Sequence, residues 1–204
     1  MDIERWQSLM QRMGVAENAD TFEKLLAAYS EPHRFYHTTE HISKCLEHLD
    51  EATHLAGSHE EVEAALWFHD AVYDPQSEDN EARSASWAAE FLTYAGLCER
   101  TSTRVRDHIL ATQHDAAPCD ADSALVVDID LAILGSTPPE YQVFETNVRK
   151  EYEWVPGPLF RRKRRAILSS FLERPNIYLN EHWRSRYEAS ARGNLRSAIR
   201  ALGG

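Results

Sequence analysis

The chain has 204 residues, 43% hydrophobic and 27% charged, and 22 Lys and Arg against 33 Asp and Glu give a formal net charge of −11. This length suits one globular domain with a substantial core, and the acidic balance argues against a general nucleic-acid binder, because phosphate is repelled by an acidic surface. Three scattered cysteines are too few for a disulfide framework, no signal peptide is visible and no apolar run reaches the roughly 20 residues of a membrane helix, so we expect a cytoplasmic protein without a membrane partner.

Apolar residues recur with helical spacing along most of the chain, beginning with the stripe of Ile3, Trp6, Leu9 and Met10. Glycine and proline stand between these segments rather than inside them. In chain order we predict helices over residues 3–13, 21–30, 41–56, 60–73, 80–95, 103–114, 123–134, 139–152, 159–172 and 178–202.

The expected helix ends follow from local signals. Asp20 or Thr21 is expected to cap the second helix, and Thr38 or Thr39 the third. The sequence VPGP at residues 155–158 is short enough to be a turn rather than a domain linker. No hairpin signal of the Asn-Gly type occurs, so we predict an all-α fold, a single domain over residues 1–204 built as a bundle of about ten helices.

Four groups of polar residues interrupt this apolar helical pattern: His37 with His41, His69 with Asp70, His114, and Asp128 with Asp130. A carboxylate buried without a partner costs several kcal/mol, so the acids in AALWFHDAVY (64–73) and VVDIDLAIL (126–134) need one. Imidazole and carboxylate groups are ligands that borderline divalent metals prefer. The pattern therefore favours two acid-bearing helices that converge on one cation.

Each group also has a plain structural explanation. The pair His37 and His41, four residues apart and so expected on one helical face, binds a metal only in a minority of such cases. His69 and Asp70 could be a buried pair whose charge is balanced by a distant arginine. Asp128 could cap the following turn, and His114 could belong to a polar helix end.

The order H…HD…D resembles the HD-domain superfamily of metal-dependent phosphohydrolases, and in particular its bacterial branch of predicted metal-dependent HD phosphohydrolases. The resemblance runs from about Arg34 to the C-terminal helix. It is carried by five segments: RFYHTTEHI (34–42), ALWFHDAVYDP (65–75), DNEARSA (79–85), ATQHD (111–115) and DIDLAILG (128–135).

This resemblance implies roles for particular residues. The metal ligands would be His41, His69, Asp70 and Asp130, with Asp128 orienting a ligand, holding the helix or replacing Asp130 as the ligand. Asp70 would also belong to the catalytic residues, together with His37 as a general acid and His114 in contact with phosphate or a second metal. Because no further histidine pair follows, we expect one divalent ion, drawn from Mn, Fe, Mg, Co, Ni and Zn.

The implied substrate is a small phosphorylated molecule, most naturally a nucleotide, and the residues expected to face it are Arg34, Asp74, Asn80, Glu81 and Arg83. Arginine fits phosphate with two parallel hydrogen bonds. The alternatives are surface ion pairs for the two arginines, helix capping for Asn80 and Glu81, and a helix end for Asp74.

The basic run RRKRR at residues 161–165 raises nucleic-acid binding as an alternative. Helical spacing spreads the five charges around the axis, so we expect them to neutralise acidic neighbours such as the helix ETNVRKEYE (145–153) instead. Besides the phosphohydrolase, three functions remain open: a metal-binding module that senses a nucleotide or partner without turnover, an iron enzyme for oxygen chemistry, and a plain helical scaffold.

Overall fold

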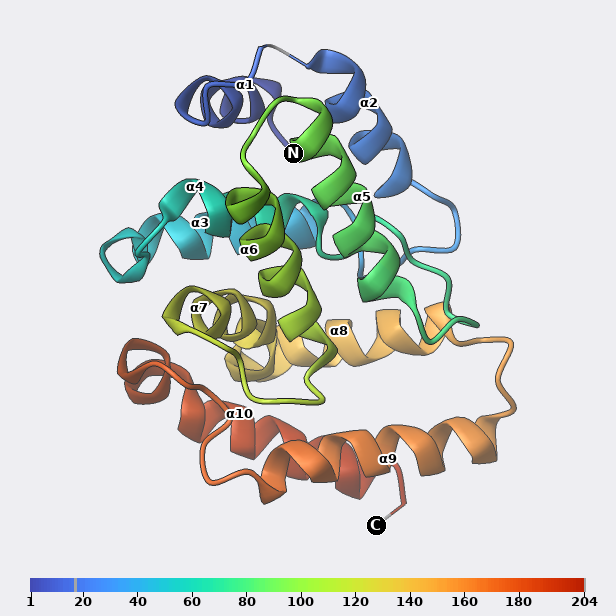
Figure 1. Ribbon diagram of the computed structural model, residues 1–204. Helices are drawn as coiled ribbons and strands as arrows, with labels where there is room; N and C mark the ends of the chain where they lie inside the picture. The colour runs from blue at the N-terminus through green and yellow to red at the C-terminus, as the bar shows by residue number, and fades with distance from the viewer. Residues whose placement is uncertain (17, 204) are drawn as a thin grey trace. The chain divides into compact units, whose positions relative to one another are not determined.

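Ten α-helices and no strand make up the part of the chain, residues 1–16 and 18–203, that this computed structural model describes (Figure 1). The predicted all-α fold with about ten helices is confirmed. The helices are α1 (Ile3–Arg12), α2 (Ala19–Ala28), α3 (Thr39–Glu51), α4 (His59–Phe68), α5 (Asn80–Tyr94), α6 (Glu99–Leu110), α7 (Ala121–Asp130), α8 (Pro138–Glu151), α9 (Gly157–Glu173) and α10 (Glu181–Ala201). Three short 3-10 helices join them: η1 (Thr53–Leu55), η2 (Ala111–Gln113) and η3 (Leu131–Gly135).

The helices fall into two compact units, Met1–Ile129 and Asp130–Gly204. The boundary lies inside α7, one residue before its end. The prediction of one domain over residues 1–204 stays a prediction. No helix in the described part of the chain is long and apolar enough to cross a membrane.

The first unit is organised around α4, whose residues from Val62 to Phe68 are all buried. Helices α1, α3, α5 and α6 pack against it. Trp6 of α1 meets Trp67 edge-on with ring centroids 5.4 Å apart, and Phe91 of α5 stacks on Phe68 at 5.7 Å. Such aromatic pairs add to the free energy gained from burial alone, so they fix the orientation of α4 between its neighbours.

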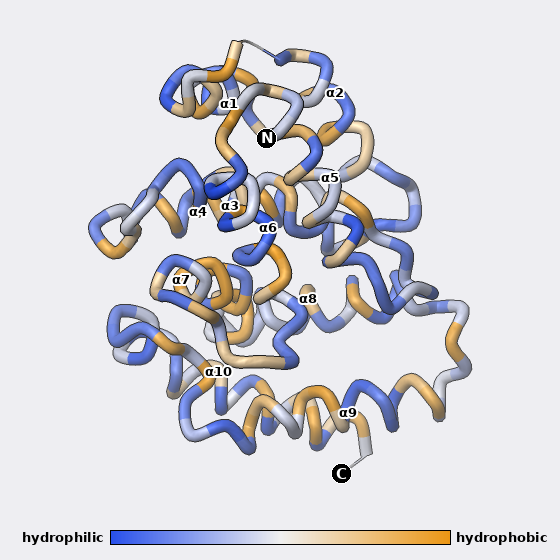
Figure 2. The backbone as a smooth tube through the Cα atoms, viewed as in Figure 1, coloured by the Kyte–Doolittle hydropathy of each residue, from blue (hydrophilic) through white to orange (hydrophobic). Residues whose placement is uncertain are grey.

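The second unit is held by α10, which packs against η3, α8 and α9. The side-chain amide of Asn194 donates to the carbonyls of Leu134 and Ser136, at 2.9 Å each, and so satisfies backbone acceptors at the end of η3. Close packing at this point demands glycine, because a Cβ on Gly135 would lie 2.5 Å from the Cβ of Tyr187. Figure 2 shows both hydrophobic and hydrophilic residues along α9, and its buried residues are Phe160, Leu168 and Phe171.

Several predicted helix ends are wrong. Helix α2 is capped by Asn18, whose Oδ1 accepts from the Thr21 amide at 2.9 Å, and not by Asp20 or Thr21. Helix α4 ends at Phe68 instead of Tyr73. Two further helices are shorter than predicted. Helix α6 ends at Leu110 and not at residue 114, and α7 ends at Asp130 and not at residue 134. The chain continues from them as the 3-10 helices η2 and η3.

Two further expectations concern the second unit. The VPGP sequence is no domain linker, because it joins α8 and α9 of one unit, but the turn itself lies at residues 152–154, and Gly157 and Pro158 already begin α9. Within the basic run, Arg164 pairs with Glu145 of α8 at 2.6 Å, as the neutralising interpretation requires.

A buried ion pair joins α1 to α4. The Glu63 carboxylate is 2% exposed and binds Arg5 Nε at 2.8 Å, with Arg12 as a second partner and His59 3.5 Å away. Arg5 also binds Asp50 of α3 at 2.7 Å. Burial raises the pKa of Glu63, but the hydrogen bonds from His59 and Arg5 and the charges of Arg5 and Arg12 outweigh it, so the pKa lies below its ordinary value of 4.5.

We expect Glu63→Gln to lower the free energy of unfolding at neutral pH by about 1–3 kcal/mol, because the arginines lose their buried anion. A lowered folded-state pKa stabilises the protein above the ordinary carboxyl pKa, and this contribution is lost as pH falls through the folded-state value. The difference between wild type and variant should therefore shrink below about pH 4.5. Urea unfolding across this pH range measures it, with Glu47→Gln, exposed on α3, as the control; a difference that stays constant with pH would contradict the assignment.

Candidate metal centre

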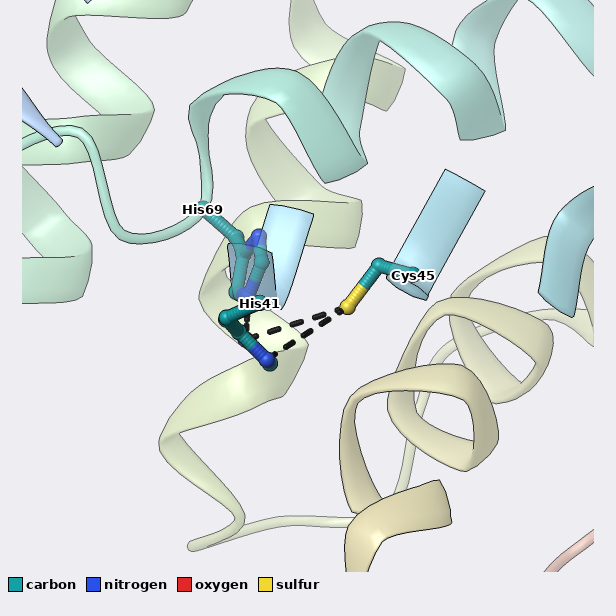
Figure 3. Close-up of side chains that lie close together, drawn as sticks. All are labelled: His41, Cys45 and His69. Carbon is teal, nitrogen blue, oxygen red and sulfur yellow. Dashed lines mark hydrogen bonds between the residues drawn. The ribbon is translucent and has the colours of Figure 1, made fainter. Parts of the chain in front are cut away.

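Two histidines and a cysteine of the first unit meet in its interior (Figure 3). His41 lies in the first turn of α3 and Cys45 one turn later, while His69 follows the last residue of α4. All three side chains are buried and their ligand atoms lie within 4.8 Å of one another, so the group could hold a metal ion.

The imidazole of His69 is oriented by the backbone of α4. Its Nδ1 lies 3.0 Å from the Leu66 carbonyl oxygen. A carbonyl only accepts hydrogen bonds, so Nδ1 carries a proton, and when the ring is neutral its lone pair is on Nε2. A backbone carbonyl bound to one ring nitrogen is the usual way in which proteins orient a histidine whose other nitrogen binds metal.

Three donor atoms form a nearly equilateral triangle. His41 Nε2 lies 3.1 Å from His69 Nε2, and Asp70 Oδ2 lies 3.4 Å from the former and 3.2 Å from the latter. Ligand atoms about 2.0–2.2 Å from one ion and about 90–110° apart lie about 2.9–3.5 Å from each other. The observed spacings therefore match those of three ligands around a single divalent ion.

Asp70 is the acidic member of this triangle, and its side chain is 16% exposed. Burial raises its pKa, but while these rings are protonated the charges of His69 and His37 and hydrogen bonds from His41 and His69 hold the pKa well below its ordinary value. The carboxyl group is therefore ionised at neutral pH, as a metal ligand must be.

Arg34 lies buried behind the same turn. Its Nη1 donates to the carbonyls of Asp70 at 2.7 Å and His37 at 3.1 Å, its Nη2 to that of Ala71 at 3.1 Å, and its Nε to Glu31 at 3.0 Å. The guanidinium thus fixes the backbone on both sides of the donor triangle. The predicted phosphate contact of Arg34 stays a prediction, and the bonds described here give it a positioning role.

His37 does not share a helical face with His41, so that part of the prediction is wrong. Helix α3 begins at Thr39, after the extended Thr38, which places His37 in the preceding loop. Its ring nevertheless lies 6.1 Å from the ring of His41 and stacks on Tyr73 at 4.2 Å. A loop histidine at this position is close enough to the donor triangle to act on a bound molecule.

The residues after Asp70 are held by hydrogen bonds to side chains of α5. The Asn80 side chain both accepts from the Asp74 amide and donates to the Asp74 carbonyl, at 2.9 Å each, and Ser84 Oγ accepts from the Val72 amide at 3.0 Å. Asp74 and Asn80 therefore hold the loop that follows the site. Glu81 lies in the first turn of α5, and Arg83 is exposed, with Asp79 3.9 Å away.

The other predicted residues lie further along the chain. His114 ends η2 in the left-handed conformation, with φ of 60°. Asp128 is completely buried in α7, whereas Asp130 is the last residue of α7 and the first of the second unit. Residues two apart on a helix do not face each other, so Asp128 and Asp130 point in different directions.

Cys45 is the member of the group that the sequence analysis missed. It stands four residues after His41, the spacing that places two side chains on one helical face, and it is 2% exposed. This spacing is the feature of the sequence that could have identified Cys45 as a candidate ligand. The observation that three cysteines are too few for a disulfide framework gives no hint of a role for Cys45 alone.

The chain matches no family model, no curated protein and no solved structure. Its function has to follow from the donor atoms and their geometry.

We expect Arg34→Lys to lower the free energy of unfolding by about 2–4 kcal/mol, because one ammonium group cannot replace a fork that serves three carbonyls. Chemical denaturation followed by circular dichroism measures the change. Arg83→Lys, on the exposed face of α5, is the matched control and should stay within about 0.5 kcal/mol of wild type. Equal unfolding midpoints for the two variants would show that Arg34 does not hold the turn.

Proposed function

We propose that the protein is a metal-dependent phosphohydrolase of the HD-domain type, acting on a nucleotide or another small phosphate ester. The observation that carries this proposal is the triangle of His41 Nε2, His69 Nε2 and Asp70 Oδ2, with sides of 3.1 to 3.4 Å. Two neutral nitrogens and one carboxylate oxygen are a donor set suited to a divalent transition ion.

The electrostatics of the group support a cation. With Nδ1 of His69 protonated, the Nε2 lone pair of His69 faces His41 Nε2 across 3.1 Å. Either a proton or a metal ion must lie between two nitrogens at this distance, because two lone pairs would repel. The ionised Asp70 beside them adds the negative charge that favours a divalent ion.

A divalent ion bound here would supply Lewis acidity toward a phosphoryl oxygen and make hydroxide available near neutral pH. The protein supplies the remaining parts. Asp70 and the two histidines hold the ion, with Asp130 or Asp128 as the proposed further ligand. His37, whose ring stacks on Tyr73, is proposed as the general acid that protonates the leaving oxygen. His114 is proposed to contact the phosphate.

The substrate side of the proposal rests on α5 and the loop before it. The guanidinium of Arg83 is exposed on the first turns of α5, next to the residues that hold the loop after Asp70, so it is the proposed phosphate clamp. Glu81 lies beside it. Arg34, Asp74 and Asn80 are proposed to act indirectly, by fixing the loop backbone.

We expect Asp70→Ala to lose the bound ion and to abolish phosphate release, because the donor triangle loses its anion. Metal content of protein prepared without chelators is measured first, with about one equivalent expected for wild type. Phosphate release from a panel of nucleotides is then measured with added Mn²⁺ or Mg²⁺.

Asp20→Ala is the matched control, because Asp20 is an exposed aspartate paired with Lys24 on α2. It should leave both metal content and phosphate release unchanged. Wild-type protein that holds metal but releases no phosphate from any nucleotide would contradict the hydrolase and leave sensing or oxygen chemistry. Wild-type protein without metal would overturn the assignment as a whole.

A further inference from the structure

A sulfur atom lies beside the nitrogen and oxygen donors of the candidate metal centre. Cys45 Sγ is 3.7 Å from Nε2 and 3.8 Å from Nδ1 of His41 (Figure 3). The side chain is buried, and its sulfur belongs to the same group of ligand atoms as His41 and His69. The donor set of the proposed phosphohydrolase contains only nitrogen and oxygen, so it leaves this sulfur without a role.

The distance between Cys45 Sγ and His41 Nε2 is close to that between two ligands of one ion. A thiolate about 2.3 Å and an imidazole nitrogen about 2.0–2.1 Å from a tetrahedral zinc ion lie about 3.6 Å apart. The distance of 3.7 Å between Cys45 Sγ and His41 Nε2 fits this value. Because Sγ is almost equally far from both ring nitrogens, it lies over the ring face and not on the line of the Nε2 lone pair. A rotation about the single side-chain torsion of Cys45 is therefore needed to bring it to an ion on Nε2.

Helical spacing places Cys45 close to His41. His41 and Cys45 are four residues apart within α3, so their side chains leave the helix on the same face. His69 comes from the end of α4 on the other side of the group. Sulfur and nitrogen donors from two chain segments therefore lie within 4.8 Å of one another, and Asp70 Oδ2 lies 3.4 Å from His41 Nε2.

We propose that Cys45 is a thiolate ligand of the bound ion and that it gives the site a preference for Zn²⁺ over Mg²⁺ and Mn²⁺. The inference rests on the metal centre of the proposed function and goes further by naming the class of ion. Thiolates select zinc and other soft or borderline ions, whereas Mg²⁺ and Mn²⁺ prefer oxygen donors.

Cobalt(II) serves as the spectroscopic probe, because Co²⁺ bound to a thiolate gives an intense charge-transfer absorption in the near ultraviolet. We expect this band in wild-type protein titrated with Co²⁺ and its loss in Cys45→Ser. The Zn²⁺ dissociation constant should rise about tenfold or more in Cys45→Ser, with less than about a threefold change for Mn²⁺. Circular dichroism and thermal unfolding of the same samples report whether the variant folds.

The chain has three cysteines, which allows a converse variant. Replacing Cys98 and Cys119, both exposed, by serine leaves Cys45 as the one thiol, and the band should persist. This arm tests the inference even if Cys45→Ser fails to fold. Co²⁺ bound without the band, or a band lost in the double variant, would overturn Cys45 as a ligand and leave the metal centre standing. Failure of wild type to bind Co²⁺, Zn²⁺ and Mn²⁺ would overturn both proposals.

Discussion

The guanidinium of Arg34 holds the two chain segments that carry the donor atoms, and the candidate metal centre depends on it. Its bonds to the carbonyls of His37 on one side and of Asp70 and Ala71 on the other join the loop before α3 to the turn after α4. A buried charge is tolerated there because carbonyl dipoles and Glu31 compensate it. The 3.1 Å approach of His41 and His69 follows from where these two segments are fixed.

The same bonds explain how an apolar helix accommodates a carboxylate. From the sequence, the helix continues to Tyr73, because no glycine or proline occurs before Pro75. In the structure it ends at Phe68, and Asp70 lies in the turn that follows. The Asp70 carbonyl accepts from Arg34, which is 36 residues earlier in the chain, and the Val72 amide donates to Ser84, which is 12 residues later. Local patterns carry no information on partners that distant, so the periodicity predicts the buried face of α4 and misses its end.

The candidate site, like the end of α4, could be predicted from the sequence only in part. Composition and periodicity were sufficient for the all-α fold, and the acid and imidazole at residues 69 and 70 stood out because burial without a partner is costly. The helical face shared by His37 and His41 was wrong, because the start of α3 at Thr39 is set by loop geometry. Cys45 was missed because a buried cysteine resembles any small apolar residue until its neighbours are known. Helical spacing does not decide between Asp128 and Asp130, because it shows only that the two side chains point in different directions.

Charge balance ties the proposed function to the further inference. An ion held by two neutral imidazoles and one carboxylate leaves one net positive charge in a group whose histidines and cysteine are buried. A buried net charge is costly, and a second anionic ligand cancels it. In the proposed hydrolase that anion is an aspartate of α7, and a thiolate at residue 45 would satisfy the same requirement from within α3. The aspartate and the thiolate are therefore alternative candidates for the second anionic ligand, and the ion's preference for oxygen or sulfur decides between them.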